Sequence, residues 1–279
     1  MLSTIANLLN EGREKLADQD VAELEARLLL AHAMDKNIGF LYAWPERAVP
    51  ESAVELFREL VLRRARGEPI AHLLGRREFW SLELKISAAT LIPRPETERL
   101  VELALGLVPP YSQWSLLDLG TGSGAIAIAV ARDRPECAMT ATDVSNAALD
   151  IARENAARHQ VNNITFLAGD WFAPVVGQRF HCILSNPPYI SINDPYLERG
   201  DLQFEDRGAL VAGEDGLDAI RHIINSARAH MEPRGWLIIE HGFEQGEAIR
   251  ALLEQADFET IACHQDLAGL DRVSCARAP

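Results

Sequence analysis

Leu116-Leu117-Asp118-Leu119-Gly120-Thr121-Gly122-Ser123-Gly124, residues 116–124, is an apolar run that ends in a turn with three glycines. The apolar run 125–131 follows at once and is typical of a helix. Glycines in such a turn let the backbone approach a ligand closely, and the start of the following helix presents free N–H groups. A strand, a glycine-rich turn and a helix in this order indicate a nucleotide-like cofactor.

Asp143 ends the next apolar stretch, 23 residues after Gly120. An acidic side chain there can accept hydrogen bonds from ribose hydroxyls. A G-x-G pattern alone is weak evidence because tight turns in any α/β protein use glycine, but the strand, turn, helix and acid together favour a cofactor site. The spacing is G-x-G-x-G and not the dinucleotide G-x-G-x-x-G, so NAD or FAD is the lesser interpretation.

Apolar stretches and helical patterns alternate beyond residue 96. Strands are expected at 116–119, 138–142, 164–167, 182–185 and 236–240. Helices are expected at 146–159, behind a Ser145 cap, and at 217–231, which carries Ile220, Ile223 and Ile224 on one face. This alternation predicts an α/β domain with a mostly parallel sheet and helices on both sides.

The first 75 residues predict a small bundle of helices. Two apolar faces at helical spacing are Ile5, Leu8, Leu9 and Leu16, and then Val21, Leu24, Leu28 and Ala31. Asp20 and Ser52 each precede a glutamate by three residues, as in a capping box. Residues 79–92 favour a hairpin. We therefore expect a helical domain at 1–75, a hairpin linker at 76–95 and a second domain at 96–279.

Composition limits the partners of this chain. The net charge of -14 disfavours a protein that holds duplex nucleic acid through its phosphates. A local cluster of arginines lies beside Glu68: Arg63, Arg64, Arg66, Arg76 and Arg77. We interpret this cluster as a solvated helix end and turn in preference to a partner-binding patch. The four cysteines form no C-x-x-C and are expected to be buried free thiols, and no metal site is predicted. No apolar run is long enough to span a bilayer and no signal peptide is recognised, so we expect a cytoplasmic protein.

Asn186-Pro187-Pro188-Tyr189 directly follows the expected strand 182–185. Carboxyl ends of parallel strands line the ligand crevice, so the tetrapeptide should lie near the cofactor. Two prolines fix the backbone and remove N–H donors, Asn186 offers an amide oxygen, and Tyr189 offers an aromatic wall. These groups fit a planar substrate NH₂ whose nitrogen is aimed at an electrophilic methyl group by positioning. Alone, the tetrapeptide would indicate only a rigid turn.

The chain resembles class I methyltransferases that act on amide or exocyclic amino nitrogens, and in particular the release-factor glutamine methyltransferases called PrmC or HemK. The resemblance covers nearly the whole chain, including residues 67–72, 78–80, 92–98, 118–124, 169–172, 186–189 and 266–272. Ile92-Pro93-Arg94-Pro95-Glu96-Thr97-Glu98 is its most specific part. One departure is Phe204-Glu205-Asp206-Arg207-Gly208, where the family pattern has a proline near Asp206.

The resemblance implies a Rossmann-like methyltransferase sheet, S-adenosylmethionine as cofactor and S-adenosylhomocysteine as product. It implies a cofactor site that includes Gly120, Thr121, Gly122, Ser123, Gly124, Asp143, Asp170, Trp171 and Asn186. It implies that Asn186, Pro187, Pro188 and Tyr189 receive the substrate amide, with Asn186, Pro187 and Tyr189 as catalytic residues. From the residues alone, Asp170 and Trp171 fit a strand-end turn with a packed indole equally well. Glu96 and Glu98, which could simply open a helix, are left out of the catalytic set.

The substrate implied is the glutamine of the Gly-Gly-Gln loop in class-1 peptide chain release factors. No strong self-association signal is visible in the sequence, so we expect a monomer. One alternative is a glutamine of another protein, such as a ribosomal protein. A second is the exocyclic amine of a nucleic-acid base, which uses similar chemistry but fits the charge of -14 poorly. A third is a non-catalytic adapter that keeps the fold, against which an intact Asn186 and Tyr189 argue.

Overall fold

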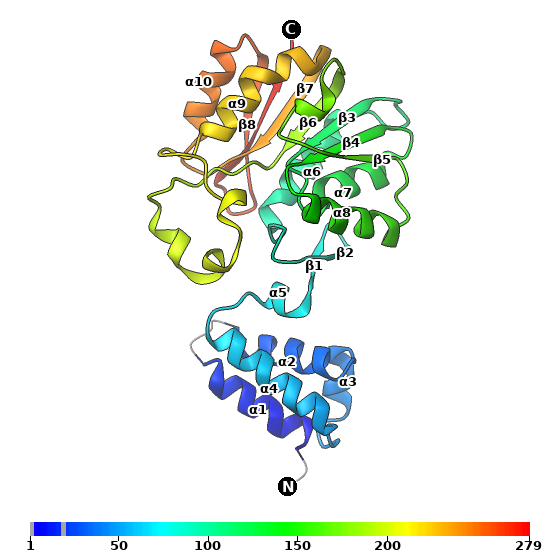
Figure 1. Cartoon of the computed structure of the whole chain (residues 1–279), viewed down its shortest axis with the longest axis vertical. Helices are drawn as coiled ribbons and strands as arrows, with labels where there is room; N and C mark the ends of the chain where they lie inside the picture. The colour runs from blue at the N-terminus through cyan, green and yellow to red at the C-terminus, as the bar shows by residue number, and fades with distance from the viewer. Residues whose placement is uncertain (1–2, 18–20) are drawn as a thin grey trace. The chain divides into compact units, whose positions relative to one another are not determined.

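The computed structural model describes residues 3–17 and 21–279. They divide into two compact units (Figure 1). The first is Met1–Arg76 together with Glu198–Phe204, and the second is Arg77–Leu197 together with Glu205–Pro279. In the part of the chain so described, no helix is long and apolar enough to cross a membrane.

The first unit is a bundle of short helices around its own core. The helices are α1 (Ile5–Lys15), α2 (Ala22–Ala33), α3 (Ile38–Ala43), α4 (Glu51–Ala65) and α5 (Ile70–Leu74). Ile5, Leu29 and Phe57 are fully buried between them. Thr4 caps α1 by accepting a hydrogen bond from the Asn7 N–H, and Asn37 caps α3 in the same way.

Two sequence predictions for this unit are wrong. Val21 and Leu24 are 53% and 51% exposed, whereas Leu29 and Leu30 are fully buried. Ala31, from the same predicted face, is buried. Leucines occur on both sides of α2, so spacing alone could not choose the inner side. Ser52 is not a cap either, because α4 already begins at Glu51 behind Pro50. The predicted cap at Asp20 lies outside the described residues.

The arginine cluster is only partly a solvated helix end. Arg64 is buried, and it donates to Glu25 at 2.9 Å and to Asp201 at 3.3 Å. Arg63 is half-exposed and pairs with Glu68. The interpretation as a solvated helix end is therefore wrong for Arg64. One of its partners, Asp201, lies 137 residues later in the sequence, so the local pattern could not reveal the contact.

The second unit is built on a seven-stranded sheet in the order β5-β4-β3-β6-β7-β9-β8. Its strands are β3 (Ser115–Leu119), β4 (Ala138–Asp143), β5 (Ile164–Ala168), β6 (Phe180–Ser185), β7 (Met231–Glu240), β8 (Glu259–Gln265) and β9 (Asp271–Arg277). β3 to β7 pair in parallel, which confirms the predicted sheet, and β9 and β8 extend it with antiparallel pairs.

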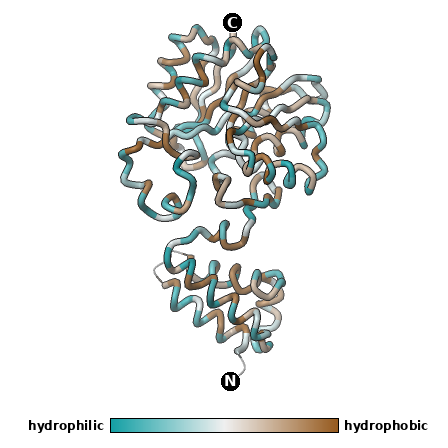
Figure 2. The backbone as a smooth tube through the Cα atoms, viewed as in Figure 1, coloured by the Kyte–Doolittle hydropathy of each residue, from teal (hydrophilic) through white to brown (hydrophobic). Residues whose placement is uncertain are grey.

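Helices cover both faces of this sheet (Figure 1). On one side lie α6 (Glu98–Leu107), α7 (Ala125–Asp133) and α8 (Asn146–Arg158); on the other lie α9 (Asp218–Ala227) and α10 (Gly246–Gln255). Adjacent residues Leu116 and Leu117 enter different core clusters because successive side chains of a strand point to opposite faces. Figure 2 shows hydrophobic residues concentrated along the central strands.

Shorter elements connect these layers. β1 (Arg76–Phe79) and β2 (Leu82–Lys85) form the predicted hairpin, and its turn residues Trp80 and Ser81 have positive φ angles of 50° and 56°. Phe79, Leu82 and Leu84 pack into the core of the second unit. The 3₁₀ turns are η1 (Pro95–Thr97), η2 (Ala173–Val175), η3 (Pro195–Glu198), η4 (Gly200–Phe204), η5 (Arg207–Ala209) and η6 (Arg228–His230).

Asn155, on α8, joins the hairpin to the glycine turn through a fully buried side chain. Its Oδ1 accepts from the Lys85 N–H at 2.7 Å, and its Nδ2 donates to the carbonyls of Lys85 and Ser123, both at 2.9 Å. A buried polar group that loses its partner destabilises a fold.

We expect Asn155→Ala to lower the free energy of unfolding by about 2–4 kcal/mol, because three backbone groups lose their partners. Urea unfolding followed by circular dichroism measures this. The matched control is Asn162→Ala at an exposed position, which should change stability by less than about 0.5 kcal/mol. Equal effects of the two substitutions would contradict the role assigned to Asn155.

Candidate active site

The glycine turn after β3 depends on backbone conformations that glycine adopts readily. Gly120, Gly122 and Gly124 have φ angles of 71°, 55° and 83°. A Cβ at Gly124 would lie 2.8 Å from Cδ1 of Ile128 and 3.2 Å from Cβ of Ala152. The turn is held against β4 because the N–H groups of Gly120 and Thr121 both donate to the Thr142 carbonyl at 2.9 Å.

Asp143 joins the glycine turn to the turn after β4. Its Oδ2 accepts from the Gly122 N–H and its Oδ1 from the Ser145 N–H, both at 2.8 Å. A carboxylate has about four lone-pair positions, so each oxygen can accept a further hydrogen bond from a ligand. Asp143 therefore connects the two turns and can still accept hydrogen bonds from a ligand.

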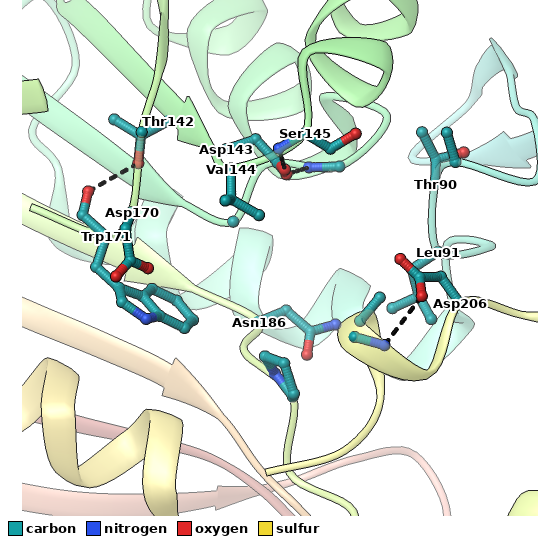
Figure 3. Close-up of a pocket in the computed structure, with 17 residues that line it drawn as sticks. Thr90, Leu91, Thr142, Asp143, Val144, Ser145, Asp170, Trp171, Asn186 and Asp206 are labelled. Atoms are coloured by element: carbon teal, nitrogen blue, oxygen red, sulfur yellow. Dashed lines mark hydrogen bonds between the residues drawn. The ribbon is translucent and has the colours of Figure 1, made fainter. Parts of the chain in front are cut away.

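A pocket of about 200 Å³ opens at this edge of the sheet (Figure 3). It is lined by Ala89, Thr90, Leu91, Gly120, Gly122, Thr142, Asp143, Val144, Ser145, Gly169, Asp170, Trp171, Asn186, Pro188, Asp206, Gly208 and Ala209. All of these residues belong to the second unit. The pocket lies at the carboxyl ends of parallel strands, the usual ligand position in an open α/β sheet.

Two walls face one another across the pocket in Figure 3. One wall is Trp171, close enough to the glycine turn that a Cβ on Gly120 would lie 3.8 Å from its ring. The other carries Thr90, Leu91 and Asp206. Acidic side chains, Asp143, Asp170 and Asp206, lie around the space between them, so the pocket favours a ligand that carries positive charge.

Glu205 connects the segment around Asp206 to residues 92–94. Its side chain is fully buried, pairs with Arg94, and accepts from the Ile92 N–H at 3.0 Å. Asp206 begins η5 by accepting from the Gly208 N–H at 3.0 Å. Thus the stretch that departs from the family pattern forms a lip of the pocket, bound to the stretch that follows the hairpin.

Asn186 lies at the end of β6, between the two walls (Figure 3). Its Nδ2 donates to Oγ1 of Thr97 at 3.2 Å. Its Oδ1 is buried and has no hydrogen-bond partner among the described residues. A buried acceptor without a partner is costly, which indicates that a ligand donor satisfies it.

The structure brings together only part of the predicted site. Gly120, Gly122, Asp143, Asp170, Trp171, Asn186 and Pro188 line the pocket, whereas Thr121, Ser123, Gly124, Pro187 and Tyr189 do not. Tyr189 packs against the second core cluster, and its hydroxyl donates to Oε1 of Glu240 at 3.2 Å. Ten further residues line the pocket and were not predicted, because their side chains form no recognisable ligand pattern in the sequence: residues 89–91, Thr142, Val144, Ser145, Gly169, Asp206, Gly208 and Ala209.

Two carboxyl groups are buried close to the site. Burial raises the pKa of Asp118 to about 7, although the Thr121 hydroxyl donates to it at 2.6 Å and acts in the opposite direction. Burial likewise raises the pKa of Glu240 to about 7, although nearby Thr97, the charge of Arg272 and the hydrogen bond from Tyr189 lower it. Both groups are fully buried.

Known proteins match this chain along most of its length. Residues 7–75 match the family described as the PrmC N-terminal domain, and residues 102–196 match the methyltransferase small domain. The release factor glutamine methyltransferase of Xylella fastidiosa strain Temecula1 is 48% identical over 263 residues, which are 94% of this chain and 96% of the relative. That of Vibrio cholerae is 46% identical over 277 residues, 98% and 96% of the two chains. This chain belongs to the release factor glutamine methyltransferase family.

This family membership confirms the resemblance that the motifs indicated, and the protein is a methyltransferase. The solved structures that resemble this chain have low sequence identity, and they support the fold alone. A methyltransferase from Pyrococcus furiosus superposes with a TM-score of 0.53 at 19% identity, covering 77% of this chain and 95% of that one. The 16S rRNA N2 G1207 methyltransferase of Thermus thermophilus, solved with AdoMet and guanosine, gives 0.53 at 18% identity, covering 73% and 50%. The class I methyltransferase sheet is thereby confirmed.

The raised pKa of Asp118 has a consequence for stability. An unfolded aspartate releases its proton near pH 4, whereas Asp118 in the fold keeps its proton up to about pH 7. Between these values the folded state binds more protons, so the contribution of Asp118 to the free energy of unfolding falls as the pH rises.

We expect Asp118→Asn, which cannot ionise, to gain stability relative to the unmodified protein by up to about 1.4 kcal/mol per pH unit between pH 5 and 7. Urea unfolding at each pH measures the difference. Asp150→Asn, at an exposed site, serves as control and should show no such trend. A difference for Asp118→Asn that stays constant from pH 5 to 7 would mean that Asp118 is ionised throughout.

Proposed function

We propose that this enzyme transfers a methyl group from S-adenosylmethionine to the side-chain amide nitrogen of the glutamine in the Gly-Gly-Gln loop of class-1 peptide chain release factors. The observation that carries the proposal is the unpartnered Oδ1 of Asn186, a buried acceptor in an acidic pocket beside the glycine turn. The family name supports the choice of glutamine and of release factors.

The residues present fit S-adenosylmethionine. The glycine turn leaves space for a ligand beside Gly122, since a Cβ on this residue would meet no other atom within 4 Å. Asp143 keeps acceptor positions for ribose hydroxyls, and Trp171 offers a flat apolar wall for adenine. The carboxylates of Asp143, Asp170 and Asp206 suit a ligand with positively charged sulfonium and ammonium groups. When bound, this cofactor supplies a methyl group attached to a positively charged sulfur.

The chain's own residues then orient the substrate nitrogen. Oδ1 of Asn186 accepts one N–H of the glutamine amide, and the backbone carbonyl of Pro187 is the proposed acceptor for the second. Holding both hydrogens turns the amide nitrogen toward the methyl group and increases electron density on it. The nitrogen would gain the methyl group as the bond from that group to the cofactor's sulfur breaks, and the proton that the nitrogen loses would pass to water. Positioning of this kind supplies much of the rate enhancement without a strong base.

Methylation of a nucleic-acid base is the second candidate, because the Asn-Pro-Pro-Tyr motif suits an exocyclic amine as well as an amide. Two observations weigh against it. The net charge is -14, and the pocket itself is lined by three carboxylates that repel phosphates. We therefore propose a protein substrate, met in the cytoplasm where release factors act, and an enzyme that works as a monomer.

The experiment that tests the function is transfer of a labelled methyl group from S-adenosylmethionine to purified release factor. Label is expected on the intact factor and not on a variant whose loop glutamine is replaced. The matched enzyme variant is Asn186→Ala, which should lower transfer by at least about 100-fold while cofactor binding stays within about tenfold. Label on bare DNA would move the assignment to bases, and a loss of cofactor affinity by several orders of magnitude in Asn186→Ala would contradict its substrate role.

We also propose that residues 1–75 dock the release factor. In support, Leu24 on α2 and Tyr42 on α3 are 51% and 63% exposed, and Arg27, one turn from Leu24, lies 4.2 Å from the Tyr42 ring centre. Leu24 and Tyr42 are exposed apolar side chains, and Arg27, which pairs with Glu23, packs on the Tyr42 ring. Aromatic residues are enriched at protein interfaces.

Replacing Leu24 and Tyr42 together by serine should raise the KM for whole release factor about tenfold, because apolar contact area is lost, and should leave the Kd for cofactor unchanged. Steady-state kinetics and calorimetry measure the two constants. Leu62→Ser, at a 49% exposed position on α4, is the control. An unchanged KM in the double variant would sink the docking proposal.

A further inference from the structure

Asp206 belongs to a short stretch of the pocket lip that is fixed on both sides. Just before it, the fully buried carboxylate of Glu205 is bound to residues 92–94. Just after it, the Leu210 carbonyl accepts from the Ile190 N–H at 2.9 Å, directly beyond the Asn-Pro-Pro-Tyr motif. The Asp206 carboxyl group is therefore held in a defined place at the lip of the pocket.

The backbone and the side chain of Asp206 have separate roles. Its φ angle is -63°, which proline also adopts, so the backbone suits the proline that the family pattern has near this position. Its Oδ1 begins η5 by accepting from the Gly208 N–H at 3.0 Å. Among the described residues, no arginine or lysine forms an ion pair with Asp206, and Oδ2 accepts no hydrogen bond. The side chain therefore adds an uncompensated negative charge to the lip.

The pocket places this charge near the expected position of the cofactor's sulfur. Asp206 lies across the pocket from Trp171, with Asn186 between them (Figure 3). Trp171 is the proposed wall for adenine, and Oδ1 of Asn186 is the proposed acceptor for the substrate amide. The sulfur that carries the reacting methyl group is therefore expected between the two walls, where a fixed charge acts on a ligand even without direct contact.

The cofactor and its product differ by one positive charge. S-adenosylmethionine carries a sulfonium group, whereas the sulfur of S-adenosylhomocysteine is neutral. The amino-acid tail, with one ammonium and one carboxylate group, is the same in both. A fixed carboxylate beside the pocket therefore attracts the cofactor more strongly than the product, whatever it contributes to binding of the parts that they share.

We propose that Asp206 is a specificity-determining residue that makes the pocket prefer S-adenosylmethionine, with its charged sulfur, over the product S-adenosylhomocysteine. This inference rests on the proposed function for the identity of the cofactor. When the methyl group leaves the sulfur, the attraction between that sulfur and Asp206 ends. Asp206 thus favours the exchange of product for a new cofactor molecule.

The test measures binding of each ligand to the whole chain by isothermal titration calorimetry, without release factor. Asp206→Asn removes the charge and keeps an oxygen that can begin η5. We expect it to raise the Kd for S-adenosylmethionine about 3- to 10-fold, a modest effect because the residue is exposed, and to leave the Kd for S-adenosylhomocysteine within about twofold. Asp206→Glu keeps the charge and should retain the ratio of the two Kd values within about twofold. Asp150→Asn, an exposed site outside the pocket, is the control and should change neither constant.

Ionic strength gives an independent readout. Salt screens exposed charges, so the preference of the unmodified enzyme for S-adenosylmethionine should weaken as NaCl rises from about 0.05 to about 0.5 M. The preference of Asp206→Asn should change less over the same range, because one of the screened charges is missing. An identical salt dependence in the two proteins would count against a role for the charge of Asp206.

The remaining outcomes separate this inference from the proposed function. Equal changes in the two Kd values for Asp206→Asn, or no change in either, would overturn the inference and leave the proposed cofactor in place. A preference lost to the same extent in Asp206→Glu would mean that the shape of the side chain, and not its charge, sets the preference. If the unmodified enzyme binds neither ligand, the proposed cofactor fails and the inference fails with it.

Discussion

The pair of hydrogen bonds from the backbone of Gly122 and Ser145 to the Asp143 carboxylate holds the site open. The Gly122 N–H belongs to the turn after β3 and the Ser145 N–H to the turn after β4. Their common acceptor, together with the bonds from Gly120 and Thr121 to the Thr142 carbonyl, fixes the spacing of the two turns. Asp143 can serve both because a carboxylate accepts several hydrogen bonds at once. Residues of both turns line the pocket between Trp171 and the opposite wall.

The parts of the fold that local sequence determines could be predicted from the sequence. The central strands are continuous apolar runs, and the glycine turn between β3 and α7 needs conformations that few other residues adopt, so both are visible in a single stretch. β8 and β9 were not predicted. β8 lies at the edge of the sheet and is only partly covered, so it mixes polar and apolar residues such as His264 and Cys263. β9 is buried over residues 273–276, but Ser274 interrupts its apolar run.

The parts of the site that could not be predicted depend on contacts between residues far apart in the sequence. Glu205 meets Ile92 and Arg94, more than a hundred residues earlier, and Thr97 meets Asn186 in a similar way. Nothing in residues 204–208 by themselves shows that they form a lip of the pocket. The inner side of α2 was hidden for a related reason, because its partner Arg64 lies on another helix.

The first unit includes Glu198–Phe204, a segment that comes between the Asn-Pro-Pro-Tyr motif and the pocket lip at Glu205. The chain therefore passes between the units three times: after Arg76, after Leu197 and after Phe204. A domain joined at one linker can be exchanged between proteins by a single recombination event. Here a single exchange after Arg76 would leave Glu198–Phe204 behind, so an incoming helical unit would meet a loop segment from another protein.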